Sequence, residues 1–294
     1  TSTFGYDDQM EPYLRATDRA VIADLCKQYA DHLRSDAEVE SDPEKYYDEF
    51  HEIDLDQLEP HIVGPHTPDL GRPVSAMAAE VDEKGYPAEL SSALIGSCTN
   101  SSYEDMSRSV SLVRQAKAAG IKLKSNFLVT PGSEQVYQTI KQDGILGEFE
   151  EAGATVLANA CGPCIGQWKR EDKQKGEANS ILTSYNRNFA KRNDGNPETL
   201  GFISSPELVV AMAFGGSMKF NPMTDTLKDK DGNDFKFDPP TGDVLPVNGY
   251  SSKDSGYEVP TKTGEVVINP SSERLAFLEP FDKQDPVADY KDLP

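Results

Sequence analysis

The stretch SSALIGSCTNSSYEDMSRSVSLVRQAKAAG, residues 91–120, predicts a buried β-strand that leads directly into an α-helix. Its first residues form a short apolar run bounded by turn-forming residues, which is typical of a buried strand. A Ser102/Asp105 capping pair marks the start of the predicted helix, and Gly120 marks its end. Between them, apolar side chains follow at helical spacing: Met106, Val110, Val113 and Ala116.

The same unit of strand and helix recurs further along the chain. Residues 121–130 and 131–144 predict a second strand and a second helix, with Ser133 as N-cap and Gly144 as the stop. Further strands are predicted at 154–160 and 180–185, and a further helix at 204–216 with Ser205 as N-cap and Pro206 in its first turn. This alternation predicts the α/β class, as a three-layer α/β/α domain with a largely parallel sheet.

Three regions of different composition predict the domain organisation. Residues 1–65 contain a helical N-terminal segment at 10–35 and an acidic connection with a short strand near 50–55. Residues 66–220 contain the α/β units, and residues 221–294 form an irregular C-terminal extension and linker. Within this extension, the DKDGND sequence at 229–234 predicts a hairpin turn and not a calcium loop, because the bidentate glutamate of such loops is missing.

Charge and hydropathy exclude two classes of partner. The 294 residues include 50 acidic and 29 basic side chains, for a formal net charge of -21. Nucleic-acid binding requires a basic surface, so this balance disfavours it. No window approaches the roughly 18 apolar residues that a membrane helix requires. The strong acidity favours a bacterial cytoplasm over a mitochondrial matrix.

Two cysteine-bearing turns each follow a predicted strand. Residues 96–100 contain Cys98, and the CGPC sequence contains Cys161 and Cys164. Because ligands bind at the carboxyl ends of the strands in open α/β sheets, we expect these three thiols to converge in one crevice. Cys26 lies in the predicted N-terminal helix, where we expect a small buried residue. Four cysteines are too few for a disulfide framework and favour a reducing compartment.

Three kinds of site are compatible with these cysteines. CGPC is the dithiol sequence of the thioredoxins, although Ala160 stands where those proteins have an aromatic residue. A structural zinc ion would need a fourth ligand, which His61 or His66 could supply. Three thiolates without a fourth ligand suit a 4Fe-4S cluster in which one iron has an open position and acts as a Lewis acid.

A basic segment follows the strand predicted at 180–185. Residues 185–192 contain three cations and no acid. Arg187 and Arg192 could each bind a carboxylate in bidentate fashion, which lysine cannot do. A solvated basic loop is the alternative interpretation, and the position after a strand favours the anion site.

Four motifs together resemble the aconitases of the mitochondrial type. They are GSCTNSSYEDM at 96–106, TPGSEQV at 130–136, VLANACGPCIGQW at 156–168 and TSYNRNF at 183–189. The resemblance extends over nearly the whole chain. It implies a 4Fe-4S cluster bound by Cys98, Cys161 and Cys164, and substrate carboxylates bound by Arg187 and Arg192 with Asn186 nearby. The implied reaction is the isomerisation of citrate to isocitrate through cis-aconitate, with a homoaconitate-type hydratase as the alternative.

The resemblance also implies that the chain is part of a longer enzyme. Family members are far longer, and their serine base lies in a C-terminal swivelling domain beyond the linker. We therefore expect residues 1–65 to be the tail of a preceding domain, the rest of the polypeptide to be the partner, and no catalytic acid or base within this chain. We expect the isolated chain to be inactive. Family members commonly have Thr-Gly-Arg in place of Ala190-Lys191-Arg192 and histidine in place of Leu200, and these departures bear on the residues that support the site and on substrate choice.

Overall fold

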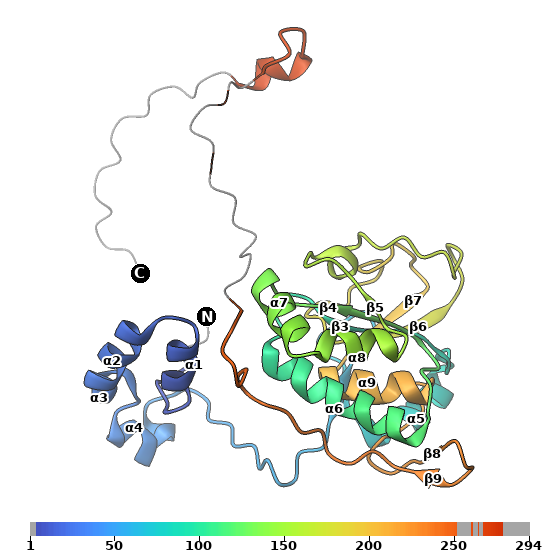
Figure 1. Cartoon of the computed structure of the whole chain (residues 1–294), viewed down its shortest axis with the longest axis horizontal. Helices are drawn as coiled ribbons and strands as arrows, with labels where there is room; N and C mark the ends of the chain where they lie inside the picture. Colours follow the sequence, from blue (N-terminus) through green and yellow to red (C-terminus); the bar gives the residue numbers. More distant parts are fainter. Residues whose placement is uncertain (1–3, 252–259, 261–263, 265–266, 279–294) are drawn as a thin grey trace. The chain divides into compact units, whose positions relative to one another are not determined.

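The computed structural model describes residues 4–251, 260, 264 and 267–278. Residues 1–256 form one unit, whose main body is built on a seven-stranded sheet (Figure 1). Residues 257–294 form a second unit, in which the 3-10 helix η3 (Glu273–Leu278) is described. The domain boundaries predicted near residues 65 and 220 stay predictions, and the predicted linker at 221–294 lies partly outside the described residues.

The strand order of the sheet is β2-β1-β7-β6-β3-β4-β5. Five strands run parallel: β3 (Leu90–Gly96), β4 (Asn126–Thr130), β5 (Thr155–Val156), β6 (Asn179–Thr183) and β7 (Thr199–Ile203). The strand β1 (His61–Val63) pairs antiparallel with β7 and with β2 (Gly71–Pro73). The prediction of an α/β fold with a largely parallel sheet is confirmed.

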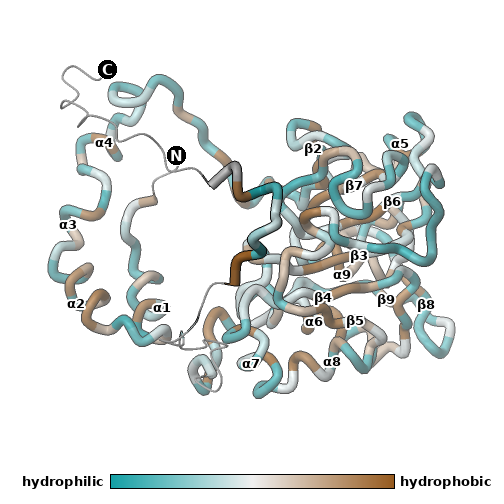
Figure 2. The backbone as a smooth tube through the Cα atoms, turned by 90° about the horizontal axis from the view of Figure 1, so that it is seen from above, coloured by the Kyte–Doolittle hydropathy of each residue, from teal (hydrophilic) through white to brown (hydrophobic). Residues whose placement is uncertain are grey.

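One face of the sheet is covered by helices, and we call it the helical face (Figure 1). Its helices are α5 (Val74–Lys84), α6 (Tyr103–Ala119), α7 (Glu134–Gln142), α8 (Ile145–Glu151) and α9 (Pro206–Gly215). The predicted caps are present: the Ser102/Asp105 capping box starts α6, and the hydroxyls of Ser133 and Ser205 accept backbone N–H bonds at the starts of α7 and α9. Figure 2 shows apolar residues concentrated in the sheet and in α9.

The opposite face of the sheet is covered by two long connections without α-helix, residues 157–178 and 184–198, which we call the loop layer. Side chains alternate along a strand, so Leu94 and Leu128 point away from the helical face. They pack with Cys164 and Tyr185, and with the partly buried Trp168. The loop layer therefore contributes the third layer, with only the short 3-10 helix η2 (Gly162–Ile165) as regular structure.

The helix predicted at 10–35 is divided into α1 (Met10–Ala16), α2 (Ala20–Gln28) and α3 (Ala30–Leu33), followed by α4 (Ala37–Ser41) and η1 (Pro43–Lys45). The break after α1 contains Asp18 in the left-handed backbone region, with φ of 59°. Among these helices only Ala23 is buried. Cys26 is partly exposed and not buried as predicted, because the buried side of α2 contains only Ala23. The strand predicted near 50–55 is absent.

The predicted hairpin turn at 229–234 is confirmed. It joins β8 (Leu227–Lys228) to β9 (Asp234–Phe235), which pair antiparallel. The Asp229 carboxylate accepts hydrogen bonds from the backbone N–H groups of Asp231 and Asn233, so its oxygens stabilise the turn itself. No helix in the described part of the chain has the length and apolar character needed to cross a membrane.

Candidate functional site at the strand ends

The carboxyl ends of the parallel strands bring the predicted site segments to one edge of the sheet, which we call the strand-end edge. The segment with Cys98 follows β3, the CGPC turn follows β5, and the segment with Arg187 follows β6. Val63 pairs with Ile203 at the end of β7, and the amide of Asn188 donates to the carbonyl of Thr67, so the turn at 64–67 lies beside β7 and the connection after β6. Four connections distant in sequence are therefore neighbours here.

The turn after β3 is anchored to the end of β6. The backbone N–H of Gly96 donates to the hydroxyl of Ser184 at 2.9 Å, and the side-chain amide of Asn100 donates to the carbonyl of Ser184 at 2.5 Å. Gly96 has φ of 123°, and a Cβ there would collide with the carbonyl of Thr130, so only glycine fits. Ser97, next in the chain, has a left-handed φ of 71°. This backbone turns Cys98 out to the surface.

The CGPC turn presents its two thiols differently. The backbone N–H of Cys164 donates to the carbonyl of Cys161 at 2.7 Å, which closes the turn. Cys161 is exposed, whereas Cys164 is buried beside Leu94, Leu128 and Tyr185. The same burial raises the pKa of the Tyr185 phenol above its ordinary value, so Tyr185 remains uncharged at neutral pH.

Asn186 links two of the three thiol positions. Its amide nitrogen lies 3.4 Å from the hydroxyl of Thr99, and that hydroxyl lies 3.8 Å from the sulfur of Cys98. Its amide oxygen lies 3.9 Å from the sulfur of Cys164. The segments with Cys98 and Cys164 therefore contact the same side chain.

Three thiols are the donors that an iron-sulfur cluster requires, although the three side chains do not converge on one point in the described structure. All three cysteines are free thiols on neighbouring turns. Within the described residues, no three His, Cys, Asp or Glu side chains stand close enough together to hold a metal ion. Cys98 and Cys161 are exposed, so their side chains can change rotamer without disturbing the core.

Neither predicted arginine has a carboxylate partner in the described part of the chain. Neither Arg187 nor Arg192 forms an ion pair with a described residue, although the chain has 50 acidic side chains. Among the residues described, the one hydrogen bond of the Arg187 side chain is to the carbonyl of Asn186, at 2.7 Å. The Nε atom of Arg192 is buried and has no partner among the described residues. An unpaired guanidinium donor of this kind is suited to an anionic ligand.

Three further polar residues lie near this edge, and of these only His66 had been considered from the sequence, as a zinc ligand. Asn188 is buried, and its amide donates to the carbonyls of Thr67 and Gly201 at 3.1 and 3.4 Å. Asn193 is also buried and donates to the carbonyl of Pro163. His66 has φ of 64°, and its Nδ1 atom is buried with no partner in the described chain. The single asparagines that alternate with other residues beside the arginines were the only sequence signal for Asn188 and Asn193.

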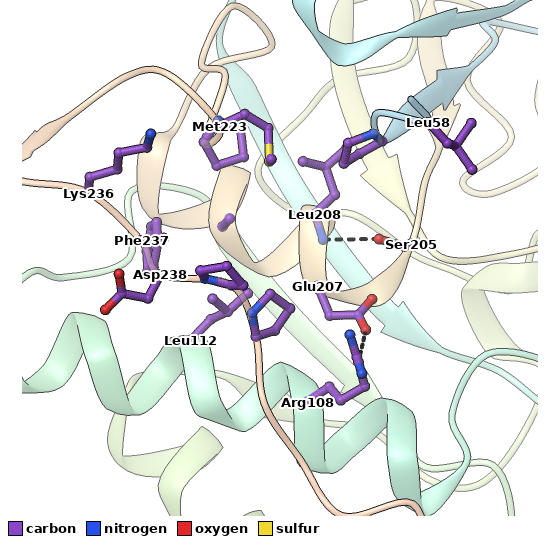
Figure 3. A pocket seen from close by; sticks show the side chains of 15 residues that line it. Leu58, Arg108, Leu112, Ser205, Glu207, Leu208, Met223, Lys236, Phe237 and Asp238 are labelled. Carbon is purple, nitrogen blue, oxygen red and sulfur yellow. Dashed lines mark hydrogen bonds and ion pairs between the residues drawn. The ribbon is translucent and has the colours of Figure 1, made fainter. Parts of the chain in front are cut away.

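A separate cavity of about 670 Å³ lies on the helical face and includes none of the predicted site residues (Figure 3). Its walls are mostly apolar and come from α6, α9 and residues 236–240. An ion pair of 2.8 Å between Arg108 and Glu207 lies on its wall (Figure 3). It has no cysteine and no free arginine, so we assign the candidate site to the strand-end edge.

Residues 1–216 match the Aconitase family (aconitate hydratase). The chain belongs to the aconitase family. It is 54% identical over its full length to "Aconitate hydratase, mitochondrial" of Gracilaria gracilis and covers 37% of that protein. Matches of the same name have 54% identity in Schizosaccharomyces pombe, over 97% of the chain and 36% of the relative, and 53% in Saccharomyces cerevisiae, over 100% and 37%.

Two consequences follow from these relatives. The chain spans little more than a third of the length of the curated aconitases that it matches. The expectation of a bacterial cytoplasm is contradicted, because these relatives are named as mitochondrial enzymes. Net acidity was the wrong guide, since surface charge reports on solubility and association and not on compartment.

Proposed function

We propose that this chain is the cluster-binding part of an aconitate hydratase, a hydro-lyase that isomerises citrate to isocitrate through cis-aconitate. The observation that carries the proposal is the meeting of two kinds of group at one edge of the sheet. Three free thiols lie on turns after β3 and β5, and two arginines that have no carboxylate partner among the described residues follow β6. The family and the names of the relatives support the same reaction.

In this proposal Cys98, Cys161 and Cys164 bind a 4Fe-4S cluster. When bound, the cluster supplies a Lewis-acidic iron with an open position for a substrate hydroxyl and carboxylate. Arg187 and Arg192 each bind a substrate carboxylate through paired N–H donors. Asn186, between Thr99 and Cys164, orients the substrate beside the cluster.

The proposed domain organisation assigns residues 1–65 to the tail of a preceding domain, 66–220 to the cluster-binding domain and 221–294 to the linker. The chain covers 37% of the relatives, and we assign none of its residues as catalytic acid or base. We therefore propose that it is inactive alone and that the remaining polypeptide completes the site. Measurable citrate dehydration by the purified chain would contradict this point.

Anaerobic incubation with iron and sulfide tests the cluster. We expect the chain to take up both and to develop the broad visible absorbance of a cluster with thiolate ligands. The Cys98→Ser variant should lose this absorbance, whereas Cys26→Ser, which replaces a cysteine of the N-terminal helices, should keep it. Zinc retention without iron uptake, or disulfide reductase activity that survives Cys98→Ser, would contradict the proposal and favour a zinc site or a dithiol enzyme.

Substrate choice is tested on the same reconstituted chain. Citrate should perturb the spectrum of the cluster at lower concentration than homocitrate does. The reverse order would favour a homoaconitate-type hydratase. An Arg187→Lys variant should weaken the citrate response, because lysine cannot make the bidentate contact.

A further inference from the structure

The CGPC turn and the segment that carries Arg192 are joined by one buried side chain. Asn193 is 5% exposed, and its amide donates to the carbonyl of Pro163 at 3.1 Å. Pro163 lies between Cys161 and Cys164, so the hydrogen bond reaches the centre of the turn. The carbonyl also accepts a backbone hydrogen bond, from the N–H of Gly166, at the longer distance of 3.5 Å. Asn193 is therefore the closer partner of this carbonyl.

The two backbones also pack directly against each other. Gly166 has φ of 87°, and a Cβ at this position would lie 3.1 Å from the carbonyl oxygen of Arg192. At this distance a Cβ would displace one of the two backbones by a few tenths of an ångström. The turn that carries two thiols and the segment that carries an arginine are thus in close backbone contact.

The Oδ1 end of the Asn193 side chain lies against the sheet. The Oδ1 atom of Asn193 faces Gly201 of β7, where an added Cβ would lie 3.4 Å from it. The side chain therefore spans from β7 to the CGPC turn. Without the amide, the carbonyl of Pro163 keeps only the longer bond of 3.5 Å from Gly166, so its loss would favour opening of the turn.

We propose that Asn193 is a positioning residue that fixes the CGPC turn against the Arg192 segment. The inference that Asn193 keeps the CGPC turn closed depends only on these contacts. The further inference, that Asn193 sets the distance between the cluster ligands and a substrate-binding arginine, rests on the proposed function. Asn193 itself contacts neither thiol, and it acts through the carbonyl of Pro163.

Thiol labelling tests the closure without any cluster. In the metal-free, reduced chain, iodoacetamide should modify exposed Cys161 quickly and buried Cys164 slowly, and mass spectrometry follows the two separately. In Asn193→Ala the rate at Cys164 should rise about tenfold, with the rate at Cys161 unchanged, because the turn opens more often. Gly166→Ala should raise the rate at Cys164 as well, since its Cβ forces the two backbones apart.

Asn188→Ala is the matched control. Asn188 is as buried as Asn193, lies in the same connection and also donates to backbone carbonyls, but it does not contact the CGPC turn. It should lower the midpoint of urea unfolding by a similar amount and leave labelling of Cys164 within about twofold of the parent. Equal labelling of Cys164 in Asn193→Ala and the parent would overturn the proposal, and so would an equal rise in both asparagine variants.

A second measurement addresses the consequence for the cluster. After anaerobic reconstitution, Asn193→Ala should lose its visible absorbance in air about tenfold faster than Asn188→Ala, because an open turn exposes the ligands. Equal bleaching rates would overturn this consequence. If the parent chain takes up no iron, the proposed function fails, whereas the labelling result still decides whether Asn193 closes the turn.

Discussion

The two faces of the sheet differ in the structure that covers them and in how it is packed. On the helical face, five helices cover the sheet, and the interior is a continuous apolar core that includes Phe127, Phe149 and Phe214. In the loop layer, the apolar cluster contains only Leu94, Leu128, Cys164 and Tyr185 as buried members. The proposed ligands and anion-binding residues all come from the strand-end turn of β3 or from the loop layer.

Polar contacts hold the loop layer together where apolar packing is thin. The guanidinium of Arg170, with a side chain only 3% exposed, donates to Asn179 and Asp172 at 2.7 and 2.5 Å and lies 3.7 Å from Asp194. Asn179 in turn donates to Thr199 at 2.9 Å. The helical face therefore contributes most of the apolar packing, whereas the loop layer contributes polar groups in fixed positions.

The largest expected effect on the free energy of unfolding comes from a pair of neighbouring residues whose side chains lie on opposite faces of the sheet. Phe127→Ala should lower the free energy of unfolding by about 3–5 kcal/mol, because it leaves a cavity beside Phe149 in a rigid core. Leu128→Ala, which faces the loop layer, should cost only about 2 kcal/mol because irregular chain can relax into the space. Urea unfolding measures both. A larger loss of stability in Leu128→Ala than in Phe127→Ala would contradict this difference between the two faces.

Removing the central cation of the loop layer should have the next largest effect. Arg170→Ala should cost about 2–3 kcal/mol, because it leaves the buried carboxylate of Asp194 without its cation. Lys175→Ala, an exposed cation in the same connection, should change the free energy of unfolding by less than about 0.5 kcal/mol. Equal unfolding midpoints for these two variants would show that the polar network contributes nothing.

A stabilising change is expected at Lys191. Its φ of 66° lies in the left-handed region, where a side chain is strained and glycine is not. Lys191→Gly should therefore raise the free energy of unfolding by about 0.5–1 kcal/mol. Lys169→Gly, at an exposed lysine outside that region, should be neutral or destabilising, and thermal unfolding can rank the two. A destabilised Lys191→Gly chain would contradict this account.

The smallest effect concerns an ion pair on the outer surface of the helical face. Arg114 binds Glu148 through two contacts of 2.8 and 2.7 Å, and this hydrogen bonding holds the pKa of the Glu148 carboxyl below its ordinary value. A lowered pKa adds stability above the ordinary glutamate pKa of about 4.3 that is lost as the pH falls through the lower value. Glu148→Gln should thus cost about 0.5 kcal/mol at neutral pH and nothing in strong acid. A constant difference across this range of pH would be inconsistent with the pair.

Much of the helical face could be predicted from the sequence because its signals are local. Apolar periodicity and caps located α6, α7 and α9 within a few residues. The helices α5 and α8 and the strand β7 were missed. The strand β7 includes Gly201, and α8 starts directly after Gly144, which was interpreted only as a stop. The predicted N-terminal helix failed because its apolar spacing did not reveal the break at Asp18.

The candidate site was only partly predictable. Placement after a strand identified the segments of Cys98, the CGPC turn and Arg187, since parallel strands end at a common edge. Asn193 could not be assigned, because its partner Pro163 lies 30 positions away and nothing local specifies that contact. The turn containing His66 is placed by the pairing of β1 with β7 and by the bond from Asn188 to Thr67, neither of which the sequence pattern indicated.

The two border strands of the sheet bear on how the protein behaves at high concentration. One border is β2, three residues long and ending in Pro73, which has no N–H to donate, and the other is β5, with two residues. Unpaired borders are the usual starting points for strand addition between molecules. Borders this short offer little template for aggregation, so this sheet should resist growth from one copy to the next.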